Sequence, residues 1–102
     1  MNIKKRYFNG GPVCEVTFNL PSEEAEFATT VHIVGEFNGW DIYATPMKKL
    51  KDGTFTITID LEREREYQYR YLVDFTKWED DRDADKYTPT PFGDSVNSVV
   101  VV

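Results

Sequence analysis

The chain has 102 residues, a net charge of −6 and an aromatic content of 15%. A chain of this length suits one domain that buries roughly two thirds of its unfolded surface, so we expect no structural metal or disulfide. The acidic charge argues against nucleic acid and anionic membranes as partners, because both are bound through Lys and Arg. The many aromatic side chains argue against disorder. The composition as a whole suggests a neutral or weakly polar ligand, or no ligand.

The first residues are basic from Met1 to Arg6, as at the beginning of a signal peptide. No apolar stretch follows them, because residues 7–8 lead directly into Asn9-Gly10-Gly11-Pro12. The sequence contains no apolar run of roughly 18 residues that could span a membrane. Cys14 is the only cysteine, which excludes an internal disulfide and suits a reducing compartment. We therefore expect a cytoplasmic protein.

Residues 1–12 are expected to form an N-terminal arm, and residues 13–102 a single domain. From Val13 to Leu20 apolar and polar residues alternate, which predicts a half-buried strand. Its apolar face consists of Cys14, Val16, Phe18 and Leu20. Within this face Cys14 is predicted to be an unreactive core thiol.

A second strand is predicted from about Thr30 to Phe37. Asn38-Gly39 then predicts a tight turn, and Trp40 follows the turn directly. His32 is the only histidine, and we expect it at the surface or rim of this strand rather than in a metal site.

Two more strands are predicted in the middle of the chain, after a short strand at residues 47–50. Residues 54–61 alternate cleanly between threonine or aspartate and large apolar side chains. Residues 62–66 alternate Glu and Arg, which are good helix formers. A helix, however, would scatter Tyr67, Tyr69 and Tyr71, whereas a strand places all three on one face. We therefore predict a hairpin connection at 62–66 and a strand over Tyr67–Asp74.

The segment from Glu79 to Gly93 is acidic and then proline-containing, and we predict a long loop. Asn97–Val102 is predicted to be the last strand. Six or seven strands separated by turn signals, with no convincing helix, predict an all-β fold. The expected architecture is an immunoglobulin-like antiparallel β-sandwich.

The acidic loop has one feature of a calcium site. Asp81, Asp83 and Asp85 have the spacing that begins an EF-hand loop. That loop requires Gly at its sixth position and Glu at its twelfth, where this chain has Lys86 and Phe92. We therefore expect a solvated acidic loop, with no metal and no other cofactor.

The order of several short motifs resembles the glycogen-binding carbohydrate-binding module family 48. This family includes the glycogen-binding domain of AMP-activated kinase β subunits and the N-terminal early-set domains of isoamylases. The motifs are Gly35-Glu36-Phe37-Asn38-Gly39-Trp40, Pro46-Met47, Asp52-Gly53-Thr54-Phe55, Tyr67 to Asp74, Trp78 and Asn97 to Val101. The resemblance covers residues 13–102 and implies an early-set β-sandwich that binds an α-glucan.

The resemblance also implies which side chains contact the sugar. Trp40 and Trp78 would each stack on a glucose ring, and Arg70 would donate hydrogen bonds to hydroxyl groups. A late loop would supply Phe92, Ser95 and Asn97. From the residues alone, the alternatives are core packing for the tryptophans, a solvated strand position for Arg70, a turn role for Asn97 and a core plug for Phe92.

Two functions follow as hypotheses. The first is a non-catalytic module that binds glycogen, starch or maltooligosaccharides, because the plentiful carboxylates lie in no recognisable catalytic motif. The second is a protein-interaction or accessory module of a glycan-metabolising enzyme that keeps the fold without binding sugar. It would contact its partner through an edge strand such as Asn97–Val102 or through the acidic loop. This alternative is favoured by the long turn before Trp78, which the kinase-type modules lack.

Overall fold

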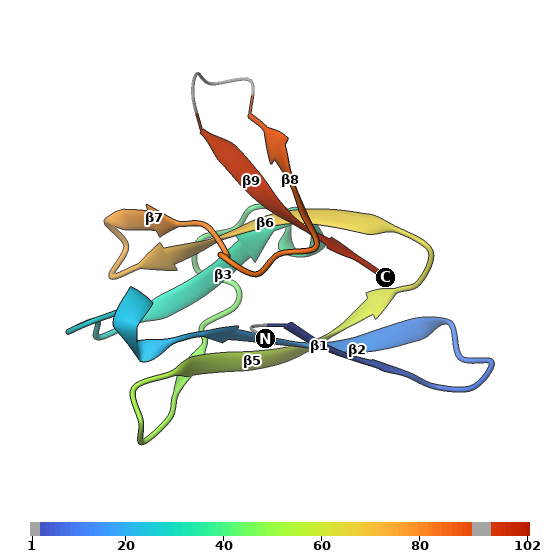
Figure 1. Ribbon diagram of the computed structural model, residues 1–102, viewed down its shortest axis with the longest axis horizontal. Coiled ribbons are helices and arrows are strands. Elements are labelled where there is room, and N and C mark those ends of the chain that lie inside the picture. Colours follow the sequence, from blue (N-terminus) through green and yellow to red (C-terminus); the bar gives the residue numbers. More distant parts are fainter. Residues whose placement is uncertain (1–2, 91–94) are drawn as a thin grey trace.

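The computed structural model describes residues 3–90 and 95–102, which form two antiparallel β-sheets stacked as a sandwich (Figure 1). Sheet A contains, in spatial order, β1 (Ile3–Tyr7), β2 (Val13–Leu20), β5 (Phe55–Glu62) and β4 (Lys48–Lys49). Sheet B contains β3 (Val31–Gly35), β6 (Glu66–Val73), β9 (Val96–Val101) and β8 (Lys86–Pro89), and β7 (Lys77–Glu79) also pairs with β6. Two short 3₁₀ turns are η1 (Ser22–Glu24) and η2 (Glu36–Asn38). The predicted immunoglobulin-like sandwich is confirmed.

The core lies between the two sheets and is built from the alternating strands. The whole predicted apolar face of β2, including Cys14, is fully buried. On the facing sheet, Tyr69 and Tyr71 of β6 are also fully buried. The Phe18 ring packs edge-on against the Tyr69 ring, with their centroids 5.0 Å apart. The tyrosines therefore share one face, as predicted for a strand and not for a helix.

The other face of β6 points away from the core. Arg70 pairs with Val34 on β3, and Leu72 pairs with His32, so these four side chains lie on the outer face of sheet B. The expectation that His32 lies at the surface or rim of its strand was wrong, because this residue is only 7% exposed. The ring of Phe75, with its centroid 4.6 Å from that of His32, covers it.

The second predicted strand ends earlier than expected, at Gly35 instead of Phe37. The backbone of Gly35 lies so close to β6 that an added Cβ would be 2.5 Å from the Gln68 carbonyl oxygen and 2.8 Å from the Tyr69 Cβ. A larger residue therefore does not fit here without a backbone shift. The chain then enters η2, which leads to the turn before Trp40.

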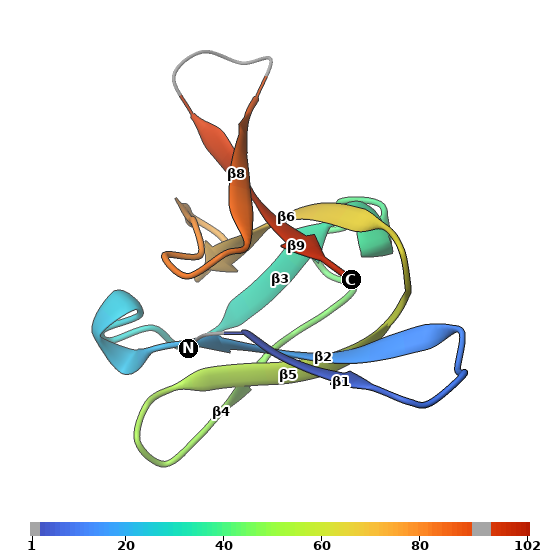
Figure 2. The same ribbon diagram turned by 45° about the vertical axis from the view of Figure 1, so that its right-hand side comes forward.

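Three short strands lie where the sequence predicted an arm or a loop. β1 lies within the expected arm and pairs with β2 from Ile3, opposite Phe18, to Tyr7, opposite Cys14. The expected loop over 79–93 contains the end of β7 and all of β8. β8 and β9 form a hairpin that projects away from the body of the sandwich (Figures 1 and 2). Nowhere in the described part of the chain does a helix have the length and apolar character needed to cross a bilayer.

Candidate functional site

A pocket of about 510 Å³ lies on the outer face of sheet B. Its lining residues come from β6, β7, the β8–β9 hairpin and the segment after η2; they are Trp40, Gln68, Arg70, Trp78, Thr90, Ser95 and Asn97. The structure thus brings together five of the six residues singled out from the sequence. The sixth, Phe92, lies outside the described residues and its role stays a prediction.

The position of Trp40 is set by the turn that precedes it. Gly39 and Trp40 both adopt left-handed backbone conformations, with φ angles of 66° and 60°. This conformation is unfavourable for a bulky residue such as tryptophan and is more common at functional sites than elsewhere. The Trp40 N–H donates to the Gly35 carbonyl oxygen at 2.9 Å, and the side chain is 39% exposed.

The side chain of Asn38 holds this turn in place. Its Oδ1 accepts a hydrogen bond from the Gly35 N–H, and its Nδ2 donates to the Ile33 carbonyl oxygen and to Thr45 Oγ1, each at 3.0 Å. The amide thus connects the end of β3 to the segment that returns along it. Asn38 therefore fixes the turn that presents Trp40 but does not line the pocket itself.

Trp78 lies on β7, opposite Leu72 of β6, and is 43% exposed. The guanidinium of Arg70 lies over its indole ring, with the Cζ atom 5.7 Å from the ring centroid. Arg70 Nε is also 3.3 Å from Asp80 Oδ1. Because the Asp80 carboxylate lies beside the Arg70 guanidinium, this part of the pocket carries little net charge.

The turn that connects β6 to β7 is fixed by Asp74. Its Oδ1 accepts hydrogen bonds from the N–H groups of Thr30 and Thr29, both at 2.8 Å. These two bonds hold the pKa of the Asp74 carboxyl below its ordinary value. The longer turn before Trp78, noted in the sequence, is therefore a structured connection, and it leaves Trp78 at the pocket.

Four polar side chains of the pocket lining form two hydrogen-bonded pairs. Asn97 Nδ2 donates to Gln68 Oε1 at 3.0 Å, and the hydroxyl groups of Thr90 and Ser95 are 2.8 Å apart. Amide and hydroxyl groups can both donate and accept hydrogen bonds. The pocket therefore combines two aromatic surfaces with polar groups of both kinds.

Sequence reasoning missed Gln68 and Thr90. Gln68 is two residues before Arg70 on the same strand, so the alternation of β6 places both on one face and could have identified it. Thr90 had no such signal, because its position depends on the β8–β9 hairpin, which lies within the segment predicted to be a loop.

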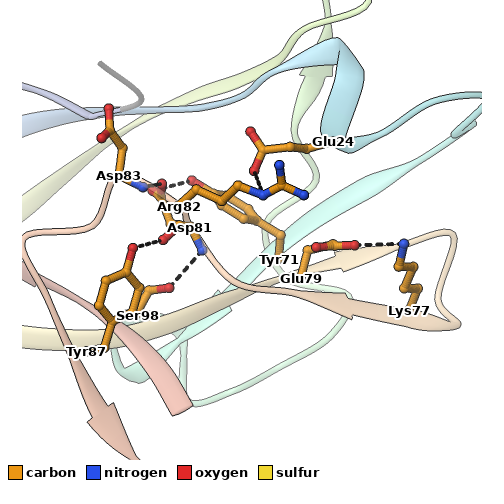
Figure 3. Close-up of polar contacts among 9 residues, drawn as sticks. All are labelled: Glu24, Tyr71, Lys77, Glu79, Asp81, Arg82, Asp83, Tyr87 and Ser98. Atoms are coloured by element: carbon orange, nitrogen blue, oxygen red, sulfur yellow. Dashed lines mark hydrogen bonds and ion pairs between the residues drawn. The ribbon is translucent and has the colours of Figure 1, made fainter. Parts of the chain in front are cut away.

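The expectation of a solvated acidic loop was wrong for Asp81, which is fully buried. Figure 3 shows its contacts with Tyr71, Tyr87 and Ser98. The hydroxyl groups of Tyr69 and Tyr71 donate to its Oδ2 at 2.7 and 3.0 Å. The Asp81 N–H donates to Ser98 Oγ at 2.8 Å, and the Tyr87 hydroxyl donates to the Asp81 carbonyl oxygen. We call Asp81, Tyr69, Tyr71, Tyr87 and Ser98 the Asp81 cluster. This cluster anchors the connection between β8 and β7, the strand that carries the pocket residue Trp78.

Burial raises the pKa of the Tyr69 and Tyr71 phenols well above their ordinary value. The Asp81 carboxylate raises these two pKa values further, because a second negative charge beside it is unfavourable. Both tyrosines are therefore hydrogen-bond donors throughout the physiological pH range.

Two of the three aspartates with calcium-like spacing, Asp81 and Asp85, have different partners, and the Asp83 N–H donates to Asp81 Oδ1 at 2.9 Å. Asp81 belongs to its cluster, whereas Asp85 Oδ2 accepts from Lys5 Nζ at 2.6 Å and from the Val101 N–H at 2.7 Å. Among residues 3–90 and 95–102, the structure shows no group of three or more His, Cys, Asp or Glu side chains that could hold a metal ion.

Comparison with curated proteins gave no match. A comparison with protein-family models matched residues 14–92 to the model described as carbohydrate-binding module 48 (isoamylase N-terminal domain). The match covers most of the chain, including β2 to β8 and most of the pocket. The chain therefore belongs to carbohydrate-binding module family 48.

Proposed function

We propose that the protein binds an α-glucan, such as glycogen, starch or a maltooligosaccharide, in the pocket between Trp40 and Trp78. The observation that carries this proposal is the meeting of two exposed tryptophans from distant segments at one pocket. Membership of a carbohydrate-binding family supports the ligand class, and the aromatic and polar side chains of the pocket suit a neutral sugar.

The pocket suits a neutral sugar for two reasons. Pyranose rings have flat C–H faces that pack against aromatic rings, and their hydroxyl groups need both donors and acceptors. Trp40 and Trp78 supply the aromatic faces, while Arg70 and Asn97 supply polar groups. Because Arg70 is paired with Asp80, a charged ligand would gain little from its guanidinium.

We propose that binding occurs without catalysis. Glycoside hydrolysis needs two carboxyl groups on either side of the scissile bond. None of the described residues that line the pocket is Asp or Glu. A cytoplasmic location, where the single cysteine can remain reduced, is part of the same proposal.

The alternative of a protein-interaction module for a glycan-metabolising enzyme finds less support. It relied partly on Asn97–Val102 as an edge strand, but β9 lies between β6 and β8 in sheet B. The Val101 N–H, moreover, already donates to Asp85 Oδ2. The exposed tryptophans, together with the hydrogen-bonding side chains that line the pocket with them, favour a sugar over a protein surface.

The proposal is tested by calorimetric titration of the protein with maltoheptaose, with cellohexaose as the β-linked comparison. We expect saturable binding of maltoheptaose only. Trp40→Ala and Trp78→Ala should each weaken binding about tenfold or more, which corresponds to about 1.4 kcal/mol. Phe8→Ala is the matched control, because Phe8 and Trp40 are equally exposed (39%) and Phe8 lies in the turn between β1 and β2 of sheet A.

The absence of saturable binding to maltoheptaose would overturn the proposal. Equal losses in Trp40→Ala and Phe8→Ala would also contradict it, because the effect would then not belong to the pocket.

A further inference from the structure

Each of the two segments that carry the pocket tryptophans also carries a second exposed aromatic residue. Tyr43 is three residues after Trp40, and Phe75 is three residues before Trp78. Tyr43 is 72% exposed and Phe75 is 45% exposed. Their rings contact each other across the two segments, with centroids 5.5 Å apart. Neither residue lines the pocket described above.

This second aromatic pair lies on the same sheet face as the pocket. Along β6, Gln68, Arg70 and Leu72 occupy successive positions of the outer face, and the first two line the pocket. Leu72 pairs with His32 on one side and with Trp78 on the other. Neighbouring strands are about 4.8 Å apart, so His32 lies about 10 Å from Trp78 across the sheet. Because the Phe75 ring contacts His32, the outer face of the sheet leads from the pocket across Leu72 and His32 to this pair.

The backbone holds both aromatic residues in position without a ligand. Asp74 and Phe75 have left-handed φ angles of 50° and 57°, and the Asp74 carboxylate is fixed by Thr29 and Thr30. The Tyr43 N–H donates to Asp41 Oδ1 at 2.8 Å, which fixes the turn that presents Tyr43. A conformation that is costly for a bulky side chain and yet held by hydrogen bonds is more common at functional sites than elsewhere.

The need to cover the outer face of the sheet explains the position of the Phe75 ring but not that of the Tyr43 ring. Phe75 covers His32, which is almost fully buried beneath it. Tyr43, in contrast, leaves most of its surface in water, so its ring adds little to the burial of the sheet. An exposed ring held in position by a second ring is a stacking surface, and the pocket likewise offers the exposed rings of Trp40 and Trp78.

We infer that Tyr43 and Phe75 form a second stacking subsite, which binds the continuation of an α-glucan chain held at Trp40 and Trp78. This inference rests on the proposed function and extends it, because it assigns a preference for chains longer than the pocket itself accommodates. The occupant follows from continuity: the second subsite shares the outer face of β6 with the first and offers the same aromatic chemistry. A chain of identical sugar units can occupy both subsites at once, so both subsites contribute to the affinity for one ligand.

The test compares maltotriose with maltoheptaose in calorimetric titrations of wild type and Tyr43→Ala. We expect the affinity for maltoheptaose to fall about three- to tenfold in Tyr43→Ala, and the affinity for maltotriose to stay unchanged. Phe75→Leu should have the same effect, because leucine keeps an apolar cover over His32 but lacks a flat face. Phe8→Ala is the control and should alter neither affinity.

The outcomes separate the two proposals. If wild type binds maltoheptaose and Tyr43→Ala binds both sugars as tightly as wild type does, the second subsite is wrong and the proposed function stands. If Tyr43→Ala loses affinity for both sugars equally, the second subsite is also wrong, because Tyr43 would then act on the pocket itself. If wild type binds neither sugar, both proposals fail.

Discussion

At the scale of single residues, the candidate site depends on side chains that do not line it. Asn38 connects three groups through its amide and so sets the direction in which Trp40 leaves the turn. Gly35 provides the close approach of β3 to β6 that this turn requires. A motif such as Phe-Asn-x-Trp therefore contains one contact residue and one residue that positions it.

We predict that Asn38→Ala lowers the free energy of unfolding by about 2 to 3 kcal/mol, because three hydrogen bonds of ordinary strength are lost. The same change should weaken binding of maltoheptaose, since Trp40 is no longer held in place. Asn38→Asp is the informative comparison: it keeps the acceptor for the Gly35 N–H but cannot donate to Ile33 or Thr45.

The measurement is urea denaturation combined with a sugar titration for both variants. A stable Asn38→Ala variant with unchanged sugar affinity would contradict the positioning role of Asn38.

At the scale of elements, the connection between β7 and β8 replaces the expected acidic loop. Asp81 can be buried because its carboxylate accepts hydrogen bonds from two tyrosine hydroxyl groups of β6. Figure 3 shows the bond from one of them, Tyr71. A run of aspartates normally indicates a solvated segment. The phenols that satisfy Asp81 are 10 and 12 residues away in sequence, so nothing near Asp81 predicted its burial.

The Asp81 cluster predicts a loss of stability at alkaline pH. Tyr69 and Tyr71 have raised pKa values in the folded protein, whereas the unfolded chain releases these protons near pH 10. Their contribution is therefore fully present below pH 10 and decreases above it, by up to about 1.4 kcal/mol per pH unit for each tyrosine. Urea midpoints measured from pH 8 to about pH 11.5 would show this slope.

The variant Tyr71→Phe separates this effect from general alkaline unfolding. It removes one of the two buried phenols of the cluster, so the slope above pH 10 should be clearly shallower than that of the wild type. Identical slopes in the two proteins would show that these phenols do not control the alkaline transition.

At the scale of the whole molecule, the sequence predicted the strands whose side chains alternate and missed those that do not. β2, β5 and β6 bury one face each, and this burial leaves a period of two in the sequence. β1, β7 and β8 are short and largely exposed, so their pairing with neighbours defines them and no apolar pattern reveals them.

The residues of the candidate site also include some that the sequence predicted and some that it missed. The residues implied by the resemblance were predicted, and the structure brings those it describes to one pocket. Gln68 could have been added from the alternation of β6, but Thr90 and the Tyr43–Phe75 contact depend on how distant segments meet. Such contacts are set by the sandwich as a whole and leave no local signal.

The central claim is that Trp40 and Trp78 bind one α-glucan chain together, and proton–nitrogen NMR tests it most directly. The chain has only two tryptophans, so each gives one indole N–H resonance. During a maltoheptaose titration, we expect both resonances to shift with the same apparent dissociation constant. Resonances that do not move, or movement of only one of them, would contradict the claim.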